Sequence, residues 1–276
     1  MPDACIPGRI TQPMSPDARR DSATSSQKKK VFFWVLMFVL FAVTFALDAP
    51  IMAPLRPLRD SHVAHVLRHT IRWLGVGYVH AAVALILLLI GLWLSDRRGS
   101  ALVILVALCS VFTLDAWATA GRLITAVSAL LLLWVAFTAL SAKHRLAGAG
   151  AWALFAFIVS GTLSSILKVV IHRPRPWVSE APPDAWIEYL KMNQFHSFPS
   201  GEATTTFALA TVLGGHFPRL RIPLFVIAAV VAISRVLVGS HHPSDIWAGA
   251  MLGTGVGQVM NYLATCRKGQ ARVSDP

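Results

Sequence analysis

Charged residues are scarce in this sequence of 276 residues, at 14%, whereas hydrophobic residues make up 55%. A soluble domain of this length needs a charged surface, so the composition excludes an ordinary soluble globular protein. A hydrocarbon core about 30 Å thick takes ~20 apolar residues for each helix that crosses it. Several runs reach this length, and together they leave no room for a separate soluble domain. The composition therefore predicts an integral membrane protein.

The chain has only three cysteines, Cys5, Cys109 and Cys266, and they lie far apart. No disulfide framework and no metal-ligand spacing follows from this arrangement. The sequence also shows no carboxylate cluster of the kind that Mg²⁺ usually requires. We therefore expect neither a metal nor another cofactor.

The formal net charge is +12, but the placement of the basic residues excludes a nucleic-acid partner. A nucleic-acid interface needs one continuous basic face with interleaved aromatic residues, and none is visible. Instead, fifteen of the 25 Lys and Arg residues flank hydrophobic runs, as cytoplasmic segments do under the positive-inside rule. They are Arg9, Arg19, Arg20 and Lys28 to Lys30; Arg97 and Arg98; Lys143 and Arg145; Arg219 and Arg221; and Arg267, Lys268 and Arg272.

Eight apolar runs predict an all-α, polytopic transmembrane helical bundle of about 6–8 spans. An even number of spans puts both tails in the cytoplasm. Only Thr119 and Ala120 separate the third run from the fourth, so these two form either a tight hairpin or a re-entrant pair. The runs are residues 31–47, 74–95, 100–118, 121–141, 149–170, 202–216, 221–239 and 245–265.

The same map divides the chain into four segments. The first thirty residues are polar and rich in Ser, Pro and Arg, which predicts a disordered cytoplasmic tail. The run at 31–47 is long enough to span and lacks a cleavage site, so we expect a retained anchor rather than a signal peptide. The segments are the tail 1–30, the N-terminal membrane helices 31–148 with an interfacial segment 48–73, a helical core 149–265, and a cytoplasmic tail 266–276.

Charges inside or at the ends of membrane helices are costly, so they are candidates for function. Beyond the tails and loops, the acidic residues reduce to Asp115, Glu202 and Asp245. The last two lie beside clusters of His, Arg and Ser. On the charge map three such clusters face the same side of the membrane, opposite the cytoplasm, so we expect them to converge. They are Lys168 to Pro176, Phe198 to Glu202, and Ser234 to Asp245.

These clusters resemble the type 2 phosphatidic acid phosphatase superfamily, in its membrane-bound lipid phosphatase branch. The family pattern is K-x6-R-P, then P-S-G-H, then S-R-x5-H-x3-D, and it is matched in order within about residues 150–265. Glu202 departs from the pattern, because the family usually has His there. The matching residues are Lys168, Arg175 and Pro176; Pro199, Ser200 and Gly201; and Ser234, Arg235, His241 and Asp245.

The residue types in these clusters suit phosphate chemistry even apart from the family resemblance. A phosphoryl group spreads negative charge over its oxygens, so it needs fixed cations and amide donors. Lys168, Arg175 and Arg235 are expected to supply the cations. Ser200 and Gly201 stand where a helix should begin, and free N–H groups there favour an anion.

The resemblance implies that His241 is a nucleophile that forms a phosphohistidine. Its other ring N–H needs an acceptor, and Asp245 can serve if a helix or a turn brings it back. In the family the second-motif His protonates the leaving group. Glu202 can do so if burial favours its neutral form, although the surrounding cations oppose this. His172 and His196 are the alternative donors.

The sequence therefore predicts a metal-independent membrane lipid phosphatase at the periplasmic face of a bacterial inner membrane. Its substrate would be a phosphomonoester or pyrophosphate of a lipid; the resemblance suggests undecaprenyl pyrophosphate, phosphatidylglycerophosphate, phosphatidate or lipid A phosphates. A lipid phosphotransferase uses the same residues. A non-catalytic phospholipid-binding member of the fold is the third possibility, and it is favoured if Glu202 does no more than pair with Arg175 or Arg235. A haloperoxidase fits poorly, because of the membrane spans and Glu202.

Overall fold

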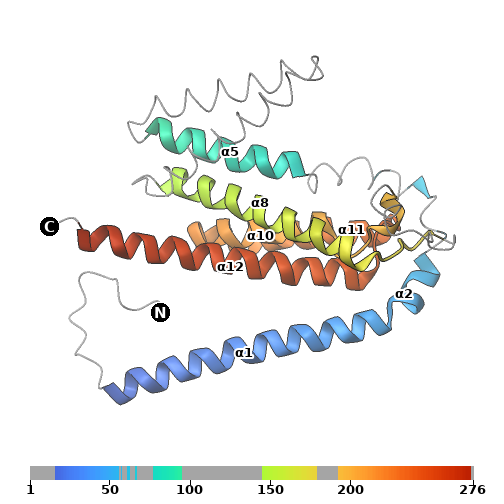
Figure 1. Ribbon diagram of the computed structural model, residues 1–276, viewed down its shortest axis with the longest axis horizontal. Helices are drawn as coiled ribbons and strands as arrows, with labels where there is room; N and C mark the ends of the chain where they lie inside the picture. Colours follow the sequence, from blue (N-terminus) through green and yellow to red (C-terminus); the bar gives the residue numbers. More distant parts are fainter. Residues whose placement is uncertain are drawn as a thin grey trace. The chain divides into compact units, whose positions relative to one another are not determined.

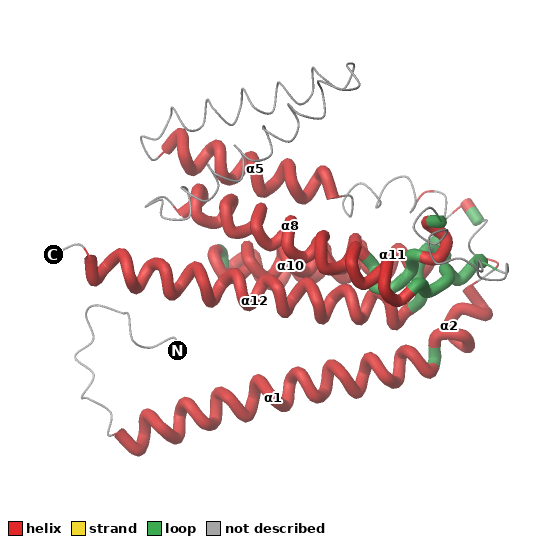
Figure 2. Tube along the Cα trace, viewed as in Figure 1, coloured by secondary structure: helices red, strands yellow, loops and turns green. Residues whose placement is uncertain are grey.

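The computed structural model describes residues 16–55, 57, 61, 62, 66, 77–94, 145–178 and 192–274. Regular structure within these residues is helical (Figures 1 and 2). The chain divides into two units, Met1–Leu47 and Asp48–Pro276. The second unit holds all of the residues predicted to form the site.

The first unit contains one helix, α1 (Pro16–Ala46). It begins fifteen residues before the predicted span, so residues 16–30 are helical and the predicted disordered tail is wrong for them. Pro16 has a backbone angle that suits the first helical turn. Ala, Arg, Gln and Lys then continue the helix as good helix formers.

The second unit begins with α2 (Asp48–Leu55) and α5 (Gly77–Leu94), followed by α8 (Arg145–Ile171). After the short helix η2 (Asn193–Phe195) come α10 (Gly201–His216), η3 (Pro218–Leu220), α11 (Arg221–Leu237) and α12 (Pro243–Ser274). The helix α5 packs on α8, and α10 packs on α8, α11 and α12.

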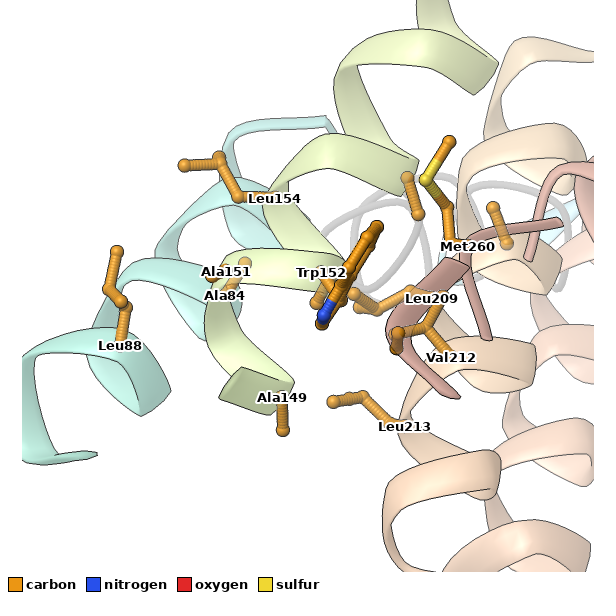
Figure 3. Close-up of a cluster of buried hydrophobic side chains, with 14 of the residues drawn as sticks. Ala84, Leu88, Ala149, Ala151, Trp152, Leu154, Leu209, Val212, Leu213 and Met260 are labelled. Atoms are coloured by element: carbon orange, nitrogen blue, oxygen red, sulfur yellow. The ribbon is translucent and has the colours of Figure 1, made fainter. Parts of the chain in front are cut away.

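The hydrophobic core lies between α5, α8, α10 and α12. Figure 3 shows Trp152 of α8 directed toward Leu209 of α10 and Met260 of α12, while Leu88 of α5 lies on the other side of α8. Buried His80 of α5 adds a polar link, because its ring nitrogens lie 3.2 Å and 3.3 Å from the hydroxyls of Thr205 and Thr206 in α10. The first two turns of α10 are thereby packed from several sides.

Glycines allow α12 to lie unusually close to α10. Gly249, Gly253 and Gly257 are four residues apart and so share one face of α12. A Cβ atom at Gly253 would lie 2.1 Å from the carbonyl oxygen of Thr204. Small residues on one helix face are a common means of close packing between membrane helices. This contact fixes the start of α10 against the start of α12.

Among the described residues, two segments are long and apolar enough to cross a membrane, Arg145–Ile171 and Pro218–Leu237. A third candidate exists if Val31–Ala46 and Asp48–Leu55 together form one span. Helices also cover the predicted runs 202–216 and 245–265, but α10 has only 16 residues, fewer than the ~20 that a span needs. The predicted runs 100–118 and 121–141 lie outside the described residues.

Two predicted segments differ from the structure. The helix α12 continues to Ser274, so most of the predicted tail 266–276 is helical. Its Arg, Lys, Gln and Ala residues are good helix formers. The predicted interfacial segment 48–73 begins instead with a buried residue, since Asp48 is 5% exposed. Most of the rest of that segment lies outside the described residues.

Candidate active site

The three sequence clusters meet at one end of the second unit, where α8 and α11 end and α10 and α12 begin (Figures 1 and 2). Backbone hydrogen bonds join the loops. The N–H of Arg175 donates to the carbonyl of Gln194 at 2.8 Å, and the N–H of Ser197 donates to that of Arg173 at 3.0 Å. The N–H of Ser200 donates to the carbonyl of Asp245 at 3.0 Å. His172 and His196, the alternative proton donors, lie in the same two loops.

The spacing between Arg235 and His241 follows from how α11 ends. Gly239 has a φ of 69°, the left-handed conformation that glycine adopts without strain. The N–H groups of Ser240 and Gly239 donate to the carbonyls of Arg235 and Val236, at 2.9 Å in both cases. This is a Schellman motif, which caps the last carbonyls of the helix. The chain turns back at once, so His241 lies close to the last turn that carries Arg235.

Asp245 lies in the first turn of α12, where Pro243 occupies the first helical position. The carboxylate reaches back and accepts the N–H of His242 at 2.9 Å, as the third residue of a capping box does. It also accepts the hydroxyl of Ser197 at 2.5 Å and a guanidinium N–H of Arg173 at 2.6 Å. Both oxygens are therefore hydrogen-bonded, although the carboxylate is fully buried.

His241 is 4% exposed, and its Nδ1 lies 2.8 Å from the carbonyl oxygen of Ser197. A carbonyl can only accept, so Nδ1 carries the proton and Nε2 keeps its lone pair. Asp245 Oδ2 lies farther from the same nitrogen, at 3.8 Å. The Ser197 carbonyl is thus the nearer acceptor for His241. Asp245 in turn holds Ser197 in place, because it accepts the Ser197 hydroxyl. Burial lowers the pKa of His241 below the ordinary value of 6.5, although Asp245 opposes the shift.

The start of α10 forms the second part of the site. Ser200 is the N-cap residue, and its hydroxyl accepts the N–H of Ala203 at 3.4 Å. A Cβ atom at Gly201 would lie 3.1 Å from Lys168 Nζ. The missing side chain therefore leaves the ammonium group of Lys168 close to the first turn of α10. Free N–H groups in this turn, the helix dipole and a cation together suit an anion.

Arg175 is held by backbone carbonyls. Its Nε donates to Asn193 at 3.0 Å and its Nη1 donates to Ser240 at 3.3 Å, which ties the first loop to the residue before His241. Burial lowers the pKa of Arg175, and the charges of Glu202 and Asp245 oppose this. An arginine remains protonated under such conditions. It therefore brings a fixed positive charge to the site.

Glu202 pairs with a cation in this structure. Its Oε2 lies 3.1 Å from Nε of Arg235, a side chain that is 4% exposed, whereas Glu202 is 27% exposed. Of the two pairings considered from the sequence, the one with Arg235 is present. Glu202 is thus paired with Arg235, which is one of the three cations predicted to bind phosphate.

Comparisons with known proteins match the part of the chain that holds these residues. Residues 149–267 match the model of the PAP2 superfamily. We call this stretch the PAP2 segment, and it contains every residue predicted to form the site. It covers less than half of the chain.

Three relatives show what proteins with similar segments do. A lipid A 1-phosphatase of Rhizobium johnstonii is 35% identical over 105 residues, which are 38% of this chain and 43% of the relative. A decaprenylphosphoryl-5-phosphoribose phosphatase of Mycobacterium tuberculosis is 34% identical over 122 residues, 44% of this chain and 62% of the relative. Lipid phosphate phosphatase 1 of Arabidopsis thaliana is 32% identical over 130 residues, 37% and 40% of the two chains.

The chain thus spans about half the length of the curated relatives that it matches. The crystal structure of a transmembrane PAP2-type phosphatidylglycerolphosphate phosphatase from Bacillus subtilis aligns with a TM-score of 0.35 and 22% identity. That alignment covers 83% of this chain and 94% of the other.

The structure adds Asp48, which lies outside the PAP2 segment and was not among the predicted residues. Its carboxylate accepts a guanidinium N–H of Arg173 at 2.6 Å, the N–H of Ser244 at 2.9 Å, and the hydroxyl of Ser244. Arg173 therefore bridges Asp48 and Asp245. An acidic residue at the end of the first apolar run was the signal in the sequence, because such a charge needs a partner.

Ser197 is the second residue that sequence reasoning missed. Its hydroxyl donates to Asp245 and its carbonyl accepts from His241, so it connects the two. A serine in a loop carries no distinctive signal, and a backbone carbonyl carries none at all. Its only mark in the sequence is its position three residues before Ser200.

Proposed function

We propose that the protein is a multi-pass membrane lipid phosphatase that forms a phosphohistidine on His241. The PAP2 segment and the phosphatase names of its relatives support this class of reaction. One observation carries the proposal for this chain: the Nδ1 proton of His241 is held by the Ser197 carbonyl, which leaves the Nε2 lone pair for attack. The location proposed is the periplasmic face of a bacterial inner membrane, with about 6–8 spans in all.

In the first step, His241 Nε2 attacks phosphorus and the bond from phosphorus to the leaving oxygen breaks. Lys168, Arg175 and Arg235 bind the phosphoryl oxygens, together with the N–H group of Gly201; the N–H of Ser200 is already bonded to the Asp245 carbonyl. These groups are fixed before the reaction, so they stabilise the developing charge without reorganisation. Nδ1 keeps its proton, and the Ser197 carbonyl and Asp245 stabilise the positive charge that develops on the ring.

Glu202 is the proposed acid for the leaving oxygen. In the free site its side chain pairs with that of Arg235. A phosphate group that binds Arg235 replaces this pairing and adds negative charge beside Glu202, and a nearby anion favours protonation of a carboxyl group. Glu202 then gives its proton to the leaving oxygen. In the second step, water gives a proton to Glu202 and attacks phosphorus, and the bond to Nε2 breaks to release phosphate.

The substrate class proposed is a lipid phosphomonoester or lipid pyrophosphate. The relatives named above act on lipid A, on a decaprenyl-linked phosphoribose and on lipid phosphates, so the shared feature is a phosphate at the headgroup of a lipid. A lipid phosphotransferase would use an alcohol or a phosphate in place of water in the second step. The residues named here serve either acceptor.

One observation favours a different function. The Glu202–Arg235 ion pair is the arrangement expected if the fold binds phospholipid without catalysis, since the pair then serves only to stabilise the site. The two functions differ in whether phosphate is released. The non-catalytic protein would bind a lipid phosphate and leave it intact.

The test is phosphate release from a panel of lipid phosphates in detergent, with EDTA present. Wild type should release phosphate, His241→Asn should release none above background, and the neighbouring His242→Asn should retain part of the activity. Release that stops with EDTA would contradict the metal-independent route. If folded wild type, His241→Asn and Glu202→Gln all release nothing from any substrate, the enzyme proposal is wrong and the lipid-binding function replaces it.

A further inference from the structure

The hydroxyl of Ser164, buried on α8, differs in its hydrogen bonding from the two other serine hydroxyls near it on this helix. Ser160 donates to the carbonyl of Phe157 at 3.2 Å, and Ser165 donates to that of Gly161 at 2.9 Å. Such bonds to the preceding turn are the usual solution for a hydroxyl within a helix. Ser164 is 2% exposed, and its Oγ has no hydrogen-bond partner among the described residues. A buried hydroxyl without a partner lowers the stability of the fold, so the orientation of the Ser164 side chain calls for an explanation.

The hydroxyl of Ser164 points at the start of α10. A Cβ atom at Gly201 would lie 3.4 Å from Ser164 Oγ and 3.1 Å from Lys168 Nζ. Ser164 and Lys168 are four residues apart, so they lie on one face of α8. The hydroxyl of Ser164 and the ammonium group of Lys168 thus lie beside the position that a side chain at Gly201 would occupy.

We propose that Ser164 donates a hydrogen bond to the phosphate oxygen that Lys168 and the first turn of α10 bind. This inference rests on the proposed function, since it concerns the same phosphate. Lys168 and the backbone N–H groups can only donate, and an unprotonated phosphate oxygen can only accept. A bound phosphate therefore gives the Ser164 hydroxyl the acceptor that it lacks in the free site. Nothing in the family pattern quoted above includes this position.

The proposal makes stability and affinity change in different directions. In Ser164→Ala the unpaired hydroxyl is removed, so the melting temperature of the ligand-free protein should stay the same or rise. The same change removes a donor to a charged acceptor, so phosphate should bind about tenfold more weakly. Unsatisfied groups kept for function commonly produce this exchange of stability for activity. A serine with a purely structural role would show the reverse pattern.

Ser160→Ala is the matched control, because Ser160 is equally buried on the same helix and its hydroxyl already has a partner. It should leave the phosphate affinity within about twofold of wild type. Ser164→Cys keeps the shape of the side chain with a weaker donor, and should bind phosphate with intermediate affinity.

The experiment measures binding of inorganic phosphate and of orthovanadate to the full chain in detergent, by isothermal titration calorimetry and by the rise in melting temperature on binding. Binding does not depend on turnover, so lipid hydrolysis is measured separately. A tenfold loss in Ser164→Ala, without a loss in Ser160→Ala, supports the role of Ser164. If Ser164→Ala and wild type bind phosphate with equal affinity, the role of Ser164 is overturned. If wild type still releases phosphate from a lipid in that case, the proposed function stands. A wild type that neither binds phosphate nor hydrolyses any lipid phosphate overturns both.

Discussion

At the scale of single residues, the role proposed for His241 as nucleophile depends on the neighbours of its ring. The Ser197 carbonyl holds the Nδ1 proton, and Asp245 orients Ser197 through its hydroxyl. Burial of the ring disfavours the imidazolium form. These effects act on different states of the ring: the hydrogen bond selects one neutral tautomer, and burial keeps the ring neutral. Both are needed for a nitrogen nucleophile.

The pH dependence of kcat/KM follows from the lowered pKa of His241. Only the neutral ring can attack, so activity is present above this pKa and is lost as the pH falls through it. Because burial lowers the pKa, the acid limb should lie below pH 6.5. The measurement is kcat/KM against pH. The titration of the lipid phosphate itself is followed by ³¹P NMR, and the profile is corrected for it. An acid limb at or above pH 6.5 would show that burial does not control the nucleophile.

Glu202 is tested by two substitutions that change its proton affinity differently. Glu202→Gln removes the acid, so kcat should fall by about 10²–10⁴-fold, the usual contribution of a general acid. Glu202→His restores a group that titrates near neutral pH, and should keep much more activity than Glu202→Gln. Both rates are measured at saturating lipid phosphate. If Glu202→Gln retains wild-type kcat, Glu202 is not the acid, and His172 and His196 become the candidates to replace next.

At the scale of elements, the site depends on where four helices start and stop. The Schellman motif at Gly239 ends α11 and the capping box at Asp245 starts α12, so His241 is held in the short segment between them. The glycines of α12 bring the first turn of α10 against the same place. The reactive groups are thus fixed by backbone geometry at helix ends more than by flexible loops.

The close contact between α12 and α10 predicts the effect of a single methyl group. In Gly253→Ala the new Cβ would lie 2.1 Å from the Thr204 carbonyl, so the helices must separate. The cost should be on the order of 2 kcal/mol, as for other overpacked cores, and activity should fall as well because the start of α10 moves. Gly148→Ala is the control, since a Cβ there meets nothing within 4 Å. Thermal melting in detergent checks both; a fully stable Gly253→Ala would contradict the close packing.

Asp48 predicts a link between α2 and the site. In Asp48→Ala, Arg173 and the start of α12 lose their buried partner, which should destabilise the fold by on the order of 3 kcal/mol. Asp48→Asn keeps an acceptor for the Ser244 N–H without the charge, and should lie between wild type and Asp48→Ala. Melting temperatures and kcat are measured together. An Asp48→Ala protein as stable and as active as wild type would show that the bridge through Arg173 is not needed.

At the scale of the whole molecule, the resemblance to the PAP2 superfamily could be predicted from the sequence because the family motifs have fixed order and spacing. Lys168, Gly201 and His241 were all assigned from that pattern, and the structure places their elements at one end of the second unit. Asp48 and Ser197 could not be assigned in the same way. One comes from a segment far away in the sequence, and the other acts through a backbone carbonyl, which every residue has.

Helix limits were less predictable than the site. Hydropathy marks where a chain is apolar, but a helix continues as long as its residues are good helix formers. The polar residues of α1 before Val31 and those of α12 after Thr265 therefore stay helical, although both were predicted as tails.

The most direct test of the central claim is to trap the phosphoenzyme. Wild-type protein in detergent is mixed with a lipid substrate labelled with ³²P in the phosphate, quenched within milliseconds, and separated from free label. The proposal predicts a protein-bound phosphate that is stable to alkali and labile to acid, as expected for phosphohistidine, and that is absent from His241→Asn and present in His242→Asn. Turnover of the substrate with no label on the protein, or label that remains in His241→Asn, would contradict His241 as the nucleophile.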